Sequence, residues 1–223
     1  MADYYSETLS AERLRLCYEI APPRVQQYLQ AEIDFVLEKI RPDDAVLELG
    51  CGHGRVLQQL IGRAKSIVGI DTSSDSLRLA RQILAGIDCQ LMEMDATDLK
   101  FADGRFDMVI CIQNGISAFH VDKRKLIGEA VRVTRSGGMA LFSSYAAKFW
   151  PHRLEWFRIQ AAHGLIGEID EEATGDGVIR CKDGFAATTI DPDEFASLTA
   201  SLGLQANITE VDDSSIFCEI VPT

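Results

Sequence analysis

The 223-residue chain lacks several features that mark whole classes of protein. No run approaches the roughly 20 apolar residues that a membrane-spanning helix needs. The first residues, Met1 to Tyr5, do not combine a basic stretch with an apolar one, as a secretory leader does. Lysine-rich and arginine-rich runs are also missing, and the net charge of −12 opposes the approach of a phosphate backbone. We therefore expect a cytoplasmic protein that binds neither membranes nor nucleic acid.

Closely spaced cysteines and histidines are missing as well. The four histidines are dispersed, and the six cysteines lack the paired spacing of zinc and redox sites, standing at Cys17, Cys51, Cys89, Cys111, Cys181 and Cys218. Several of these cysteines fall within apolar runs. We expect reduced, mostly buried thiols and no metal site.

The composition is sufficient for one sizeable core, since 47% of the residues are hydrophobic. From residue 43 to residue 145, short β-type runs alternate with helical patterns, which predicts a parallel sheet. We expect strands at 45–49, 66–70, 89–94, 106–112 and 139–143. We expect helices at 56–61, 75–84 and 123–133.

The flanking segments complete a single domain over residues 1–223. Residues 1–42 carry helical stripes that predict an amino-terminal cap, and 43–145 form the cofactor-binding core. Residues 146–190 read as an inserted lid, because an aromatic stretch is followed by two turn signals. Residues 191–223 begin with a helix capped by Asp191 and end in a hairpin over 205–211 and 215–221. The prediction is an α/β fold with a seven-stranded, mostly parallel sheet, an antiparallel carboxy-terminal hairpin and helices on both faces.

A glycine turn after the first strand indicates the chemistry. From Val46 to Arg55 an apolar run breaks into glycines at every second position, at Gly50, Gly52 and Gly54. Glycine tolerates positive φ and lets the backbone approach a ligand closely. The helix expected to follow directs unpaired N–H groups toward this turn. The pattern is typical of a nucleotide-binding loop.

Two acidic residues follow the next strands. Asp71 lies 21 positions after Gly50, where a carboxylate can accept from both hydroxyls of a ribose; the alternative is an exposed acid at a strand end. Asp95 and Ala96 follow the third strand, where a carboxylate and a backbone amide suit the edge of an adenine. Asp95 and Asp98 are equally suited to capping a short helix.

The glycine spacing separates two classes of cofactor. Dinucleotide folds require Gly-x-Gly-x-x-Gly, and here the third glycine position is Arg55. The shorter Gly-x-Gly-x-Gly turn suits a smaller ligand with an amino-acid tail along the loop. In this respect the chain resembles the class I S-adenosylmethionine-dependent methyltransferases over roughly residues 40 to 145. The resemblance rests on four ordered motifs: the glycine turn, Gly69 to Thr72, Met94 to Ala96, and Phe106 to Ile110.

The resemblance implies S-adenosylmethionine as cofactor. Glu48 would orient the methionine amino group, Asp71 would bind the ribose, and Asp95 with Ala96 would hold the adenine. The full set of implied cofactor residues is Glu48, Gly50, Cys51, Gly52, Asp71, Thr72, Asp95, Ala96 and Gln113. Arg24, in the amino-terminal helices, is a candidate partner for the methionine carboxylate.

The methyl acceptor is expected at the carboxyl end of the fourth strand, where ligands bind in open α/β sheets. Asn114 and His120 are the polar candidates for catalysis there, and His120 could equally flank the next helix. An Asn-containing segment here is common among family members that methylate small amines. We name Asn114, Phe119, Trp150 and His152 as candidate substrate residues.

The aromatic lid has two interpretations. Its rings could supply cation–π contacts to a basic acceptor. The helical spacing of Trp156 and Phe157 from Phe149, Arg153 and Gln160 also suits simple packing. The hypothesis is therefore a methyltransferase for a small molecule, perhaps an amine, with protein acceptors left open. A non-catalytic S-adenosylmethionine-binding protein and an NAD-dependent dehydrogenase are the alternatives. The oligomeric state is not readable from the sequence.

Overall fold

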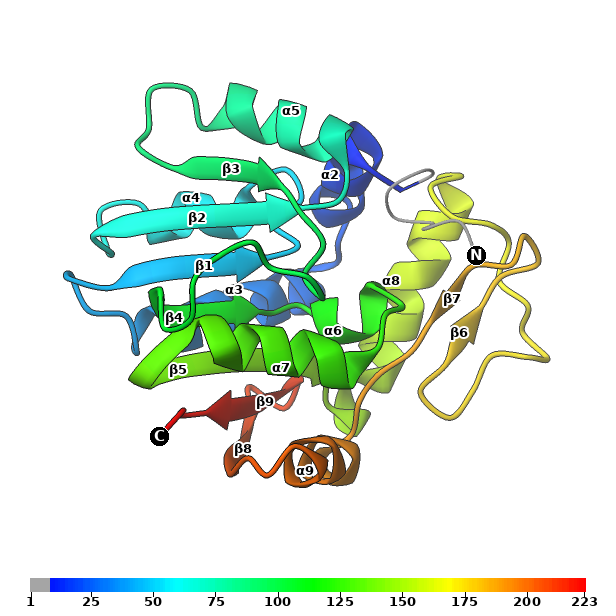
Figure 1. Cartoon of the computed structure of the whole chain (residues 1–223). Coiled ribbons are helices and arrows are strands. Elements are labelled where there is room, and N and C mark those ends of the chain that lie inside the picture. Colours follow the sequence, from blue (N-terminus) through cyan, green and yellow to red (C-terminus); the bar gives the residue numbers. More distant parts are fainter. Residues whose placement is uncertain (1–8) are drawn as a thin grey trace.

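The computed structural model describes residues 9–223, so Met1 to Tyr5 and the start of the 1–42 segment lie outside it. Seven strands form one sheet in the order β3-β2-β1-β4-β5-β9-β8 (Figure 1). Only β9 runs against its neighbours, β5 and β8. The predicted sheet is confirmed, with these bounds: β1 (Ala45–Leu49), β2 (Ser66–Asp71), β3 (Gln90–Glu93), β4 (Phe106–Cys111), β5 (Thr134–Tyr145), β8 (Ala206–Val211) and β9 (Ser215–Ile220).

Helices cover both faces of the sheet. One apolar cluster joins the sheet to the helices α3 (Pro23–Leu37), α4 (Arg55–Leu60) and α5 (Ser74–Ile83). Another joins the opposite face to α6 (Gly115–Ala118), α7 (Lys123–Val133) and α9 (Pro192–Ser201). β1 is buried along its whole length, as its continuous apolar run predicts for a central parallel strand.

The inserted segment lies beyond the carboxyl ends of the parallel strands (Figure 1). It contains η1 (Ala147–Phe149), α8 (Trp150–Ala162), β6 (Ile179–Arg180) and β7 (Ala186–Ala187). These elements share an apolar cluster with α3 and with α2 (Ala11–Glu19). Residues 146–190 therefore pack on the amino-terminal helices, next to the edge where the glycine turn lies.

Two details differ from the predictions. β5 begins at Thr134, five residues before the predicted start, and includes Gly137 and Gly138, which the prediction placed before the strand. Gly138 permits this because an added Cβ would lie 2.6 Å from the carbonyl oxygen of Asp107 on β4. The short helix α6 was not predicted. It follows Gln113 and Asn114, whose positive φ values of 57° and 63° turn the chain sharply after β4.

Within the described residues, no helix is both long and apolar enough to cross a membrane. The six cysteines are free thiols, and all but Cys89 are buried. From residue 9 onward, no three His, Cys, Asp or Glu side chains are grouped as metal ligands.

Candidate active site

The turn after β1 is fixed to the end of β2. Its glycines all have positive φ, at 73°, 53° and 86° for Gly50, Gly52 and Gly54. The amides of Gly50 and Cys51 both donate to the carbonyl of Ile70, at 2.8 and 2.9 Å. The buried Cys51 side chain fits against β2 because Gly69 has no Cβ, which would lie 2.9 Å from the Cys51 sulfur. The sequence thus builds a rigid loop at the carboxyl edge of the sheet.

Asp71, at the end of β2, faces this loop. Its Oδ2 accepts the amide of Gly52 at 2.8 Å, and its Oδ1 accepts the amide of Ser73 at 2.8 Å. A carboxylate oxygen can accept more than one hydrogen bond. The two backbone contacts therefore orient the carboxylate without excluding a hydroxyl ligand. Thr72, the next residue, is exposed.

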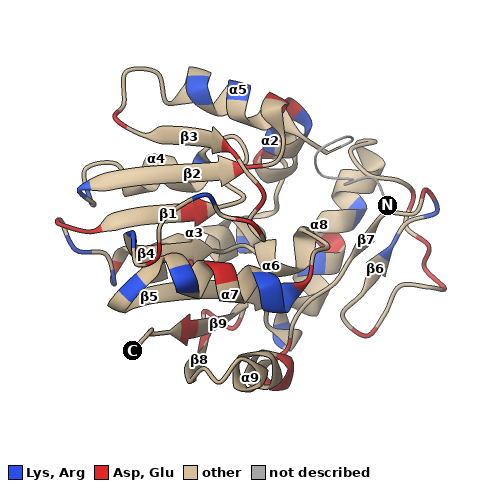
Figure 2. Ribbon diagram, in the orientation of Figure 1, with Lys and Arg blue, Asp and Glu red and all other residues tan. Residues whose placement is uncertain are grey.

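Glu48, near the end of β1, is a buried carboxyl whose Oε2 has no hydrogen-bond partner among the described residues. Burial raises the pKa of Glu48 to about 8, while the charge of Arg55 lowers it and that of Asp71 raises it. A buried polar atom without a partner is costly and indicates a donor that binds there. Figure 2 shows further acidic residues at the ends of β2 and β3, along the same edge.

The expected adenine residues follow β3. Asp95 is exposed, and its Oδ1 accepts from the amide and the hydroxyl of Thr97, at 2.7 and 2.8 Å. These contacts close a turn and use one carboxylate oxygen; no helix lies between β3 and β4, so Asp95 does not cap the short helix that we weighed against adenine recognition. Ala96 is buried beside it.

Gln113, just past β4, meets a buried acid that the sequence analysis missed. Its backbone amide donates to Oε2 of Glu32 at 2.6 Å and to the hydroxyl of Ser143 at 2.8 Å. Glu32 also accepts from the hydroxyls of Ser143 and Ser215, at 2.8 and 2.7 Å. Burial raises the pKa of Glu32 to about 7 despite these hydrogen bonds. Glu32 thereby ties α3 to the ends of β4, β5 and β9.

Comparison with known proteins identifies this arrangement. Residues 46–138 match the model of a family described as a methyltransferase domain. The match includes the glycine turn, Asp71 and Asp95, which are the residues that carry the resemblance to the class I S-adenosylmethionine-dependent methyltransferases. Over its whole length the chain superposes on the PH0226 protein from Pyrococcus horikoshii OT3, also over that chain's whole length, with a TM-score of 0.69 and 19% identity.

Curated relatives resemble part of the chain. A 2-methyl-6-phytyl-1,4-hydroquinone methyltransferase from Synechocystis is 29% identical over 136 residues, which is 56% of this chain and 42% of that enzyme. A probable tRNA methyltransferase 9B from Mus musculus is 29% identical over 60% of this chain and 27% of its own length. The chain thus spans less than half the length of these two relatives, which act on different classes of substrate by name.

Asn114 joins the sheet to the inserted segment. It is buried, its Nδ2 donates to the carbonyl of Thr188 at 2.9 Å, and its Oδ1 accepts the hydroxyl of Ser144 at 2.9 Å. The Ser144 hydroxyl in turn accepts the amide of Ile190 at 2.8 Å. Asn114 therefore holds the chain between β7 and α9 against the ends of β4 and β5.

Phe119 contacts the glycine turn directly. A Cβ at Gly50 would lie 2.3 Å from its ring, and one at Gly115 would lie 3.2 Å from it. This ring therefore packs between the cofactor loop and α6. His120, the next residue, is exposed and has a positive φ of 53°.

In the inserted segment, the aromatic rings surround a cation that belongs to the protein. The Arg153 guanidinium lies over the rings of Tyr145, Trp150 and Phe157, at 4.7, 5.8 and 5.5 Å from their centroids. The same group donates to the carbonyls of Gly177 and Ala187, at 2.7 and 2.9 Å. Two of the lid rings that we expected to hold a basic acceptor, those of Trp150 and Phe157, therefore already lie against Arg153.

The other aromatic residues of the segment serve mainly in packing. Trp156 and Phe157 are buried, and the indole N–H of Trp156 donates to the carbonyl of Cys17 on α2 at 2.9 Å. His152 is half-buried, with its ring centroid 5.6 Å from that of Phe149. The packing interpretation of Trp156 and Phe157 thus agrees with the structure.

Arg24 pairs with the turn between β8 and β9. Its Nη1 donates to the carboxylate of Asp212 at 2.7 Å, its Nη2 donates to the Asp212 carbonyl at 2.6 Å, and the guanidinium lies 5.0 Å from the Phe149 ring centroid. The suggestion that Arg24 pairs with the methionine carboxylate was wrong, because Arg24 pairs with Asp212 instead. Asp212 follows Arg24 by 188 positions, so sequence spacing gives no sign of their contact.

Helical spacing could have revealed the two buried charges. Glu32 lies seven positions after Val25 and four before Val36, on the buried stripe of α3. Arg153 lies on the stripe that α8 shares with Trp156 and Gln160. A charged residue on a buried stripe is therefore the signal to look for.

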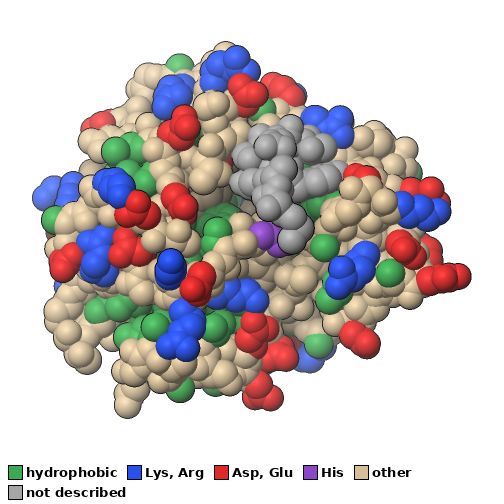
Figure 3. All heavy atoms as spheres, turned by 45° about the vertical axis from the view of Figure 1, so that its right-hand side comes forward, with side chains coloured by type: hydrophobic (Ala, Val, Ile, Leu, Met, Phe, Trp, Pro, Cys, Tyr) green, Lys and Arg blue, Asp and Glu red, His purple; other side chains and the backbone are tan. Residues whose placement is uncertain are grey.

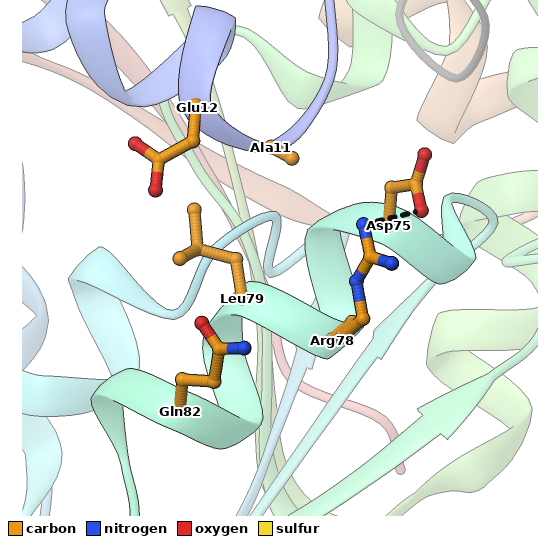
Figure 4. Close-up of a pocket in the computed structure, with 6 residues that line it drawn as sticks. All are labelled: Ala11, Glu12, Asp75, Arg78, Leu79 and Gln82. Atoms are coloured by element: carbon orange, nitrogen blue, oxygen red, sulfur yellow. Dashed lines mark ion pairs between the residues drawn. The ribbon is translucent and has the colours of Figure 1, made fainter.

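The outer surface offers weaker candidates. The face in Figure 3 carries lysines and arginines interspersed with acidic residues, rather than a continuous basic patch. A hollow of about 240 Å³ between α2 and α5 is lined by Ala11, Glu12, Asp75, Arg78, Leu79 and Gln82 (Figure 4). Its Asp75 and Arg78 already pair with each other at 2.9 Å, and no residue of the glycine turn lines it.

Proposed function

We propose that this protein transfers the methyl group of S-adenosylmethionine to a small molecule. The observation that carries the proposal is the buried Glu48 carboxyl, unpartnered among the described residues, beside the loop that Asp71 holds in place. An acid in this position requires a donor, and the ammonium group of a methionine tail is one. The glycines of the turn, at positive φ, keep its backbone tightly folded beside this carboxyl.

The residues present fit the cofactor. In our proposal Glu48 holds the ammonium group and Asp71 accepts from the ribose hydroxyls, with Thr72 beside it. Asp95 and the Ala96 amide hold the adenine. The remaining residues of the proposed cofactor site form the glycine turn and its border. They are Gly50, Cys51, Gly52 and Gln113.

The reaction asks little of the protein beyond alignment. The bound cofactor supplies an electrophilic methyl group, and an in-line displacement needs an aligned acceptor lone pair and little competing water. Residues 146–190, which Asn114 holds through its hydrogen bond to Thr188, cover this edge and would exclude water from the site. Asn114, Phe119, Trp150 and His152 remain our candidate acceptor residues, and His120 remains a candidate base because it is exposed near the same edge.

In this proposal the acceptor is a small molecule, and the aromatic rings of residues 146–190 do not bind a positive charge on it. Arg153 already lies over Tyr145, Trp150 and Phe157. An amine acceptor, as the segment around Asn114 suggested, would therefore bind in its neutral form. The net charge of −12 also favours a small acceptor over a polyanionic one. We further propose a cytoplasmic location, which suits six free cysteines.

Calorimetric titration with S-adenosylhomocysteine tests the cofactor site. We expect micromolar binding by the wild type, at least tenfold weaker binding by Asp71→Ala, and no binding of NAD. Asp98→Ala is the matched control, because Asp98 is an exposed acid after the neighbouring strand and pairs with Lys100. If S-adenosylhomocysteine does not bind, the proposal is wrong.

Asp71 also orients the Gly52 amide, so Asp71→Ala could weaken binding by disturbing the loop. Comparing two ligands separates this effect from loss of the ribose contact. We expect the wild type to bind adenosine more tightly than 2′-deoxyadenosine, and Asp71→Ala to lose that preference. Release of S-adenosylhomocysteine with a panel of neutral amines, phenols and carboxylic acids then tests turnover. Binding without turnover on any acceptor would favour the non-catalytic alternative.

A further inference from the structure

Arg55 carries unused donors beside the glycine turn. It begins α4 directly after Gly54, and its Nε and Nη2 are buried with no hydrogen-bond partner among the described residues. Its guanidinium lies 4.6 Å from the ring centroid of Tyr18 on α2. Buried guanidinium donors without acceptors are unfavourable, so this geometry suits an anionic ligand.

An unpaired acid lies near this unpaired base. Glu48 Oε2 also lacks a partner among residues 9–223, and the charge of Arg55 lowers the pKa of Glu48, so each side chain lies within the electric field of the other. Yet the two do not form an ion pair in the described part of the chain. A buried acid and a buried base that lie near each other normally share a hydrogen bond. Their separation leaves one acceptor and at least two donors for a ligand with both charges.

Neighbouring groups leave the anion to Arg55. Arg24 is engaged by Asp212 and Phe149. His53, whose ring centroid lies 5.8 Å from that of Tyr18, has its pKa lowered to about 4 by burial and by the charges of Arg55 and Arg15. His53 is therefore neutral at pH 7. Glu32, the other buried acid, already accepts from three donors.

We propose that Arg55 binds the α-carboxylate of the cofactor's methionine tail while Glu48 binds its ammonium group. This inference rests on the proposed function, since it assumes S-adenosylmethionine in the loop. The planar guanidinium can form two parallel hydrogen bonds to a carboxylate, which the single ammonium of a lysine does not match. Tyr18 is the positioning residue, because its ring supports the guanidinium from α2.

The experiment compares two ligands that differ in the tail. S-adenosylhomocysteine carries the amino-acid group, and 5′-methylthioadenosine keeps the nucleoside and sulfur without it. We expect Arg55→Met to weaken S-adenosylhomocysteine binding by 10- to 100-fold and to change 5′-methylthioadenosine binding by less than twofold. Arg55→Lys should recover only part of the loss. Arg24→Met, an arginine paired elsewhere, should leave the ratio of the two affinities unchanged.

Decarboxylated S-adenosylmethionine provides a test that does not depend on the fold of a variant. The wild type should bind it at least tenfold more weakly than S-adenosylmethionine, and Arg55→Met should bind both equally. Equal losses for S-adenosylhomocysteine and 5′-methylthioadenosine in Arg55→Met, or no loss for either, would overturn the inference and leave the cofactor site standing. Failure of the wild type to bind either nucleoside would overturn the proposed function itself.

Discussion

Binding of S-adenosylhomocysteine should release a proton from Glu48, so the affinity should rise with pH up to about 8. The pKa of Glu48 is raised to about 8, chiefly by burial, so the free protein holds this acid protonated at pH 7. An ammonium group bound against the carboxyl favours the ionised form. Occupation of the site and loss of the proton are then linked.

The loss of affinity at low pH follows from the difference between the pKa of Glu48 and the pH of the solution. Each pKa unit corresponds to about 1.36 kcal/mol, so ionising Glu48 at pH 6 costs about 2.7 kcal/mol. The affinity should therefore be about 100-fold lower at pH 6 than at its plateau, with a tenfold change for each pH unit. 5′-Methylthioadenosine has no ammonium group and should bind with little dependence on pH.

Isothermal titration between pH 5.5 and 7.5, in buffers of different ionisation enthalpy, gives both the affinity and the number of protons released. We expect close to one proton for each S-adenosylhomocysteine bound at pH 6.5. Glu48→Gln should abolish both the release and the slope. A flat affinity profile in the wild type, or an unchanged slope in Glu48→Gln, would refute the assignment of the ammonium group to Glu48.

The same group makes the stability of the ligand-free protein depend on pH. The folded-state pKa of Glu48, about 8, exceeds the ordinary value of 4.5, so its contribution is fully present below pH 4.5 and is lost as pH rises through 8. Between pH 6.5 and 8 the loss amounts to about 2 kcal/mol. Urea unfolding at both pH values should show that Glu48→Gln lacks this part of the decrease, whereas an identical decrease in both proteins would contradict the burial argument.

Three further substitutions test the site. Gly50→Ala should abolish S-adenosylhomocysteine binding, because the added Cβ would lie 2.3 Å from the ring of Phe119. Gly62→Ala is the control, because Gly62 has a similar φ of 72° but lies in open space. Its urea unfolding should show the backbone cost alone, about 1–2 kcal/mol. Asn114→Ala should lower the free energy of unfolding by about 2–4 kcal/mol, since two buried hydrogen bonds are lost; lost turnover at full stability would instead indicate a direct catalytic role. Arg153→Met should destabilise by at least about 3 kcal/mol in urea, with only partial recovery in Arg153→Lys, and an unchanged midpoint would contradict its structural role.

Local patterns predicted the sheet well because each strand and helix carries its own signal. The apolar run of β1 and the side-chain cap at Asp191 both form as expected. The predicted start of β5 was too late because we placed the strand after Gly137 and Gly138. Gly138 is needed for close approach to β4, and only strand pairing reveals that need.

The site was less predictable, because its side chains are paired by the tertiary fold. Asp71 could be named from its spacing, while the hydrogen bonds that orient it depend on how the loop closes. Arg24 was misassigned since its partner comes from the turn between β8 and β9. Arg55 was noticed only as a missing glycine, and its unused donors become visible once burial is known.

The charges at the carboxyl edge also bear on the order of binding and release. Glu48 and Asp71 lie at the ends of β1 and β2, and Glu32 on α3 accepts the backbone amide just past β4. Transfer of the methyl group removes the positive charge of the cofactor's sulfonium. A site rich in acids therefore binds the charged cofactor more tightly than its neutral-sulfur product, because the Coulombic attraction to the sulfonium is lost after transfer. By the same reasoning, neutralising Glu48 should weaken S-adenosylmethionine more than S-adenosylhomocysteine. The acids would then favour loading of the cofactor before transfer and release of the product after it.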